Sequence, residues 1–144
     1  MYFLVTQMIY AFFACFFIAY SFHTPRNGLV FAGLTGMLGT LIYNLIYLTY
    51  KTEIIAIFVG TLAICGCAEV FARISKMPII IYLTSGILPL VPGILLYQAM
   101  LLFAQDKLQE AMQLGIRSAF IAVAIALAIA LPSAIFKIIR REYR

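Results

Sequence analysis

The chain has 144 residues, of which 65% are hydrophobic and only 10% are charged. A soluble domain of this size would aggregate with such a composition, so the lipid bilayer is its expected solvent. The net charge of +5 does not indicate nucleic-acid binding, because Lys and Arg stand singly between apolar stretches and gather near the C-terminus. That distribution is typical of membrane topology.

Five apolar runs are long enough to cross a bilayer, which takes about 20 helical residues. They lie at roughly 3–22, 28–50, 54–72, 77–104 and 115–136. Residues 1–22 contain no Lys or Arg, whereas a signal peptide begins with a basic region, so we expect the first span to be retained. The sequence predicts an all-α integral membrane protein, a single transmembrane domain over 1–144 with short connections, of which the polar stretch 105–114 is the longest.

The Lys and Arg residues predict the orientation of these spans, because they accumulate on the cytoplasmic side. Seven lie on one side of a five-span layout: Arg26, Arg73, Lys76, Lys137, Arg140, Arg141 and Arg144. Three lie on the other: Lys51, Lys107 and Arg117. If 77–104 were re-entrant the count would be five against five, so the asymmetry favours five crossings. We predict a multi-pass protein of the cytoplasmic (inner) membrane with its N-terminus outside and its C-terminus inside.

Small residues recur at helical spacing in two spans. The second span carries Gly33, Gly36 and Gly39, and the fifth carries a row of alanines: Ala122, Ala126 and Ala130. Small residues let helix backbones approach closely, so these two faces are predicted packing seams. They either hold a bundle together or form a seam that slides during transport.

The fourth span, 78–100, reads PIIIYLTSGILPLVPGILLYQAM. Pro89 and Pro92 each remove an amide donor and clash with the carbonyl four residues earlier. A continuous helix from Gly86 to Gly93 is therefore not expected, and the sequence predicts a fourth span that is broken at the two prolines.

A broken helix in hydrocarbon must be covered by protein or line a wet cavity, because unpaired backbone groups are costly there. Transporter sites are built this way, with a half-helix N-terminus facing an anionic group of the substrate. We therefore predict a substrate path through the break, formed by Thr84, Ser85, Pro89, Pro92, Gly93, Tyr97 and Gln98. The alternative is a structural proline kink.

A few polar residues lie within the other spans. Glu69 is an intramembrane carboxylate and a hypothetical proton carrier, but it is also four residues from Arg73, the spacing of a helical ion pair. Gln7 and Asn44 are expected to bridge helices by hydrogen bonds.

No constellation in the sequence indicates an enzyme. Catalysis needs a positioned nucleophile, base or metal, and neither His23 nor the carboxylates Glu53 and Glu69 supply one. The cysteines, Cys15, Cys65 and Cys67, lie in apolar stretches without a nearby His. We predict no metal site and no cofactor.

Two segments resemble the threonine/serine exporter family (ThrE type), and specifically its small, separately encoded membrane subunit. They are SFHTPRNGLVFAGLTGMLGTLIYNL at 21–45 and FARISKMPIIIYLTSGILPLVPGILLYQAM at 71–100. The resemblance covers nearly the whole chain. Its motif positions in this sequence are Pro25, Arg26, Pro78, Pro89, Pro92, Gly93 and Tyr97.

The resemblance implies efflux of small molecules across the cytoplasmic membrane, of threonine and serine in some members and of dicarboxylates such as succinate in others, driven by the proton gradient. It also implies a larger membrane subunit as partner, which supplies the other transmembrane half. A homo-oligomer is a second arrangement that the sequence allows. The alternative function is a non-transporting assembly or stabilising subunit, in which the break merely fits a partner.

Overall fold

The computed structural model of the chain describes residues 2–142, and the side chains of residues 4–134. The described part consists of α1 (Tyr2–Ser21), α2 (Arg26–Tyr50), α3 (Glu53–Ser75), α4 (Ile79–Ile87), the 3₁₀ turn η1 (Leu88–Leu90), α5 (Gly93–Ala104) and α6 (Leu108–Glu142). The predicted topology also rests on Arg144 and on the side chains of Lys137, Arg140 and Arg141, which lie outside the described residues.

Four of these helices are long and apolar enough to cross a membrane: α1, α2, α3 and α6. The two half-helices Ile79–Leu90 and Gly93–Ala104 are together long and apolar enough to cross a membrane as one span, which is bent by 51° at the break. The prediction of an all-α membrane protein with a broken fourth span is therefore confirmed, with up to five spans.

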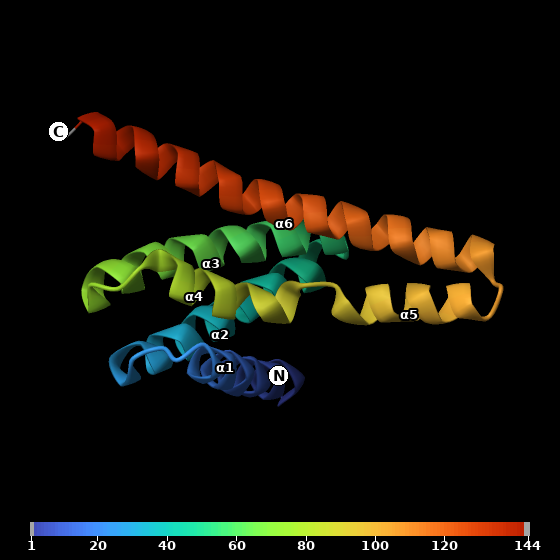
Figure 1. Ribbon diagram of the computed structural model, residues 1–144, viewed down its shortest axis with the longest axis horizontal. Coiled ribbons are helices and arrows are strands. Elements are labelled where there is room, and N and C mark those ends of the chain that lie inside the picture. The colour runs from blue at the N-terminus through green and yellow to red at the C-terminus, as the bar shows by residue number, and fades with distance from the viewer. Residues whose placement is uncertain (1, 143–144) are drawn as a thin grey trace.

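The helices α1 to α4 form a bundle in which α2 packs between α1 and α3, and α4 lies against α2 and α3 (Figure 1). The glycine face of α2 is what allows this close packing. A Cβ atom on Gly33 would lie 2.7 Å from the Phe12 ring of α1, and one on Gly36 would overlap the Cys15 side chain. A Cβ atom on Gly39 would overlap the Ile64 side chain of α3. The predicted glycine seam thus lies against two neighbouring helices.

The alanine row of α6 is placed differently. Ala122, Ala126 and Ala130 are exposed, whereas Ile121 and Ile125 are buried in a cluster with Ile57 of α3. Ala124 and Ala128 are also buried, whereas Phe120, Val123 and Leu127 are exposed, so residue size does not decide which side of α6 faces inward. A packing seam at the alanines therefore needs a second chain.

The last helix begins earlier than predicted. Only residues 105–107 connect α5 to α6, and Leu108 already starts the helix. The polar residues of 105–114 predict a connection, but residues 108–114 include good helix formers, and Glu110 in the first turn is favourable beside the helix dipole.

The hairpin of α5 and α6 extends beyond the ends of α1, α2 and α3 (Figure 1). Within it, α5 packs mainly on α6. Large apolar side chains of α5 remain exposed, among them Ile94 at 75% and Met100 at 73%. Such a surface requires either lipid or another protein around it.

Candidate functional site

The break in the fourth span leaves the first turn of α5 uncapped. After η1 the chain is extended at Val91, and the Gly93 amide donates to the Val91 carbonyl at 2.7 Å. Pro92 stands at the N-cap position and makes no side-chain hydrogen bond to the helix. Because a helix N-terminus carries unpaired amides and a partial positive charge, this end of α5 can attract the negative end of a solute.

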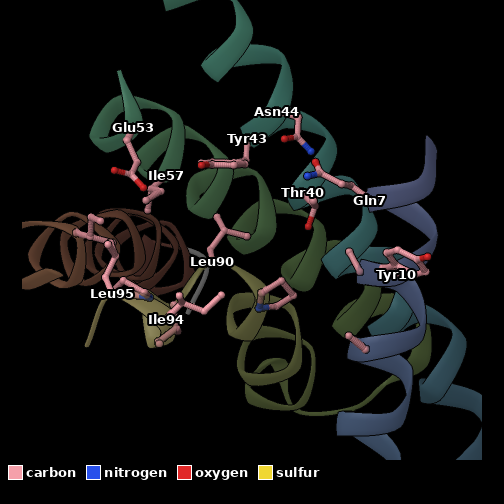
Figure 2. A pocket seen from close by; sticks show the side chains of 17 residues that line it. Gln7, Tyr10, Thr40, Tyr43, Asn44, Glu53, Ile57, Leu90, Ile94 and Leu95 are labelled. Atoms are coloured by element: carbon pink, nitrogen blue, oxygen red, sulfur yellow. The ribbon is translucent and has the colours of Figure 1, made fainter. Parts of the chain in front are cut away.

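A cavity of about 460 Å³ lies at this break. One wall is the break itself and the first turn of α5, residues 89–95. The other walls come from α1, α2, α3 and α6, and their polar members are Gln7, Tyr10, Thr40, Tyr43, Asn44 and Glu53 (Figure 2). Small-molecule pockets typically have volumes of about 300 to 1,000 Å³, so the cavity suits a small metabolite.

The uncharged polar groups gather on one side of the cavity. Figure 2 shows Gln7, Thr40 and Asn44 together there, with Glu53 on the other side. Asn44 is only 7% exposed, and its Nδ2 has no hydrogen-bond partner in the described part of the chain. The buried Oγ1 of Thr40 is also unpartnered there. A buried polar group without a partner costs about 1–3 kcal/mol, so these two groups have hydrogen-bonding capacity for a solute.

The charged side of the cavity is an ion pair between two helices. Arg117 of α6 donates through Nε to Glu53 Oε2 at 2.9 Å, and its Nη2 contacts the same oxygen. The Arg117 side chain is 56% exposed and that of Glu53 is 25% exposed, which places the pair at the rim. The pair joins the start of α3 to α6 beside the break.

A family model described as "Threonine/Serine exporter, ThrE" matches residues 7–135 of the chain. The chain belongs to this family. The matched range contains every residue that lines the cavity, from Gln7 to Ile121. No curated protein and no solved structure matches the chain. Membership of the threonine/serine exporter family makes the protein a multi-pass membrane protein of the exporter type and favours transport over an enzymatic activity.

Three of the predicted path residues lie on the cavity wall of this threonine/serine exporter family member. Pro89, Pro92 and Gly93 all line the cavity. They do so because they form the break, where the backbone leaves helical geometry and faces the space between the two half-helices.

The other four predicted path residues lie away from the cavity wall. Thr84 and Ser85 are in α4, and their hydroxyls donate to backbone carbonyls of the same helix, at 2.7 Å and 2.9 Å. Tyr97 is 66% exposed, and Gln98 is exposed as well. The reason is helical geometry: the inner face of α5 at this level is taken by α6, so both side chains point outward.

Glu69 pairs with Arg73 at 2.9 Å and does not line the cavity. Asn44 does not bridge helices through its Nδ2, in contrast to the prediction. Among the described residues, no group of three or more His, Cys, Asp or Glu side chains is placed to hold a metal ion. Sequence reasoning does not identify Thr40, Tyr43 and Glu53 as cavity residues, because only the folded chain brings them to the break.

Proposed function

We propose that this chain is the small subunit of a secondary exporter that moves small polar metabolites out of the cytoplasm, with the cavity at the break on the substrate path. The observation that carries the proposal is the cavity itself, which combines an uncapped helix N-terminus with unpartnered polar side chains. The family match supports export as the activity. Threonine, serine and dicarboxylates such as succinate are the proposed substrates.

The proposal includes a larger membrane subunit as partner. Two surfaces of this chain support it, the exposed alanine row of α6 and the exposed apolar side of α5. Both would be covered if a second polypeptide packed along the α5–α6 hairpin. A homo-oligomer would cover the same surfaces with copies of one chain. The complex lies in the cytoplasmic membrane, with the N-terminus of this chain outside and its C-terminus inside.

The proton gradient is the proposed driving force. Glu69 is the carboxylate that the sequence indicates for proton coupling, but it is paired with Arg73 and lies away from the cavity. Glu53 is a second carboxylate that could exchange protons, and it lines the cavity.

A non-transporting assembly subunit is the second candidate. The observation that favours it is the protruding α5–α6 hairpin, because an apolar arm of this kind fits a role in holding a partner (Figure 1). In that case the break would shape the arm, and the cavity would be filled by the partner.

The experiment that separates these functions uses cells that lack both this chain and its proposed partner. Each chain is restored singly and then both together, and intracellular and external threonine, serine and succinate are measured. Export that returns only with both chains supports a two-component exporter and identifies its substrate class. Export that needs the larger chain alone contradicts the proposal and leaves this chain an accessory role.

A further inference from the structure

Two unpartnered polar groups lie one helical turn apart on α2. Residues four apart share a helix face, and both Thr40 and Asn44 line the cavity. Neither Thr40 Oγ1 nor Asn44 Nδ2 has a hydrogen-bond partner in the part of the chain that the structure describes. Asn44 is 7% exposed, so bulk water does not supply the missing bonds. Buried polar groups in folded proteins are normally hydrogen-bonded, which indicates a ligand at this point.

The chemistry of the two groups limits what that ligand can be. An amide nitrogen donates, whereas a hydroxyl both donates and accepts. Together they complement a group that accepts one hydrogen bond and donates another, as a hydroxyl does. A carboxylate fits less well, because it only accepts and because burying its charge is costly without a cation. Among the described residues no Lys or Arg lines the cavity, and Arg117 pairs with Glu53 on the opposite side.

We propose that Thr40 and Asn44 form a specificity-determining subsite that binds the hydroxyl group of a small hydroxylated substrate. Both atoms are covered in the structure, so each side chain turns toward the cavity when the solute binds. Asn44 Nδ2 then donates to the hydroxyl oxygen, and Thr40 Oγ1 accepts the hydroxyl hydrogen. The uncapped first turn of α5 forms another wall of the same cavity (Figure 2). The negative end of the solute lies at this wall. This inference rests on the proposed function, because it requires the cavity to lie on the substrate path.

The test compares substrates that differ in the hydroxyl group. Inverted membrane vesicles that contain both subunits are assayed for uptake of threonine, of 2-aminobutyrate, which lacks the hydroxyl, and of succinate. The variants are Thr40→Val and Asn44→Leu, which keep the shape of the side chain and remove the polar group. Because the removed groups have no protein partner, folding should be retained. We expect the ratio of threonine to 2-aminobutyrate uptake to fall at least about tenfold.

Two control variants accompany these. Thr61→Val removes a fully buried and equally unpartnered hydroxyl of α3 that does not line the cavity, and it should leave the uptake ratio unchanged. Thr40→Ser keeps the hydroxyl and should keep the ratio. If Asn44→Leu fails to insert into the membrane, the pair Thr40→Val and Thr40→Ser still decides the question.

The outcomes separate this inference from the proposed function. An unchanged ratio in Thr40→Val, and in Asn44→Leu where it inserts, overturns the subsite while the exporter role stands, and it means that the two groups bind only water. A loss of succinate uptake with threonine uptake retained also overturns it, because the subsite would then bind a carboxylate. Uptake that does not depend on this chain at all contradicts the proposed function itself.

Discussion

Gly36 is the point where the packing of α1 against α2 is tightest. A Cβ atom at this position would overlap Cys15 Sγ, and it would lie 2.9 Å from Cys15 Cβ and 3.6 Å from the Ala11 carbonyl oxygen. Cys15 is fully buried, and a Cβ at position 36 would crowd its Cβ as well as its Sγ, so rotation of the Cys15 side chain does not relieve the contact. Gly36→Ala must therefore move α1 away from α2. Since Ala11 lines the cavity, the same shift displaces the α1 wall of the candidate site.

Two opposing effects set the size of the change in stability. Alanine is the better helix former by about 1 kcal/mol, whereas overpacking a close contact costs about 1–3 kcal/mol. Because the clash at Gly36 involves backbone-linked atoms, the upper half of that range applies, and the net loss is about 1–2 kcal/mol, a change of roughly 5 to 30 fold in the folded-to-unfolded ratio. Gly66 is the matched control, because a Cβ there meets nothing within 4 Å. Gly66→Ala should gain up to about 1 kcal/mol.

The assay is reversible unfolding of the purified protein in one detergent, with wild type, Gly36→Ala and Gly66→Ala compared side by side. The two substitutions should shift the free energy of unfolding in opposite directions. Cys15→Gly added to Gly36→Ala should restore part of the loss, because it removes both overlapping atoms. If Gly36→Ala is as stable as wild type, α1 does not pack on α2 at this point and the reasoning about the cavity wall is wrong.

Four further predictions concern the break, the two carboxylates and the orientation in the membrane. Pro89→Ala with Pro92→Ala should leave insertion and partner binding intact while export falls, since the break lines the cavity; loss of partner pull-down would support the assembly role instead. Glu53→Gln should change the free energy of unfolding by less than about 1 kcal/mol, because the side chain of its partner Arg117 is more than half exposed. The same substitution should lower export. A charge swap of the pair that restores export would show that Glu53 has a structural role. Glu69→Gln should keep the pH dependence of export in everted vesicles, because Glu69 lies away from the cavity; an altered dependence would make it a proton carrier. A cysteine added at the C-terminus should resist a membrane-impermeant thiol reagent applied from outside, and rapid labelling would reverse the predicted orientation.

The helices and the break could be predicted because local composition decides them. An apolar run of membrane-spanning length must form a helix to satisfy its backbone, and Pro89 with Pro92 interrupts a helix whatever surrounds it. The start of α6 was wrong because polarity alone does not end a helix. Residues 108–114 include the polar Gln109, Glu110 and Gln113, but the segment consists of helix formers and packs beside α5.

The cavity could be predicted only in part, because most of its wall comes from segments that are far apart in the sequence. Glu53 and Arg117 are 64 residues apart and no spacing rule connects them. Asn44 was recognised as polar within a span, but the sequence does not show which neighbour it faces. Thr84 and Ser85 were predicted to lie on the substrate path, but their hydroxyls donate to backbone carbonyls of their own helix and need no solute as a partner.

The packing of the two half-helices argues against a simple proline kink. A kink bends one helix whose two halves keep the same neighbours. Here α4 packs against α2 and α3, while α5 packs mainly against α6, and the cavity lies where the two arrangements meet. The break therefore joins a four-helix bundle to a two-helix hairpin, and the ion pair of Glu53 and Arg117 ties the two parts together beside the cavity. Because α6 also packs on α3 through the cluster of Ile57, Ile121 and Ile125, any rotation of the hairpin about residues 91–92 would have to slide this contact as it changed the width of the cavity.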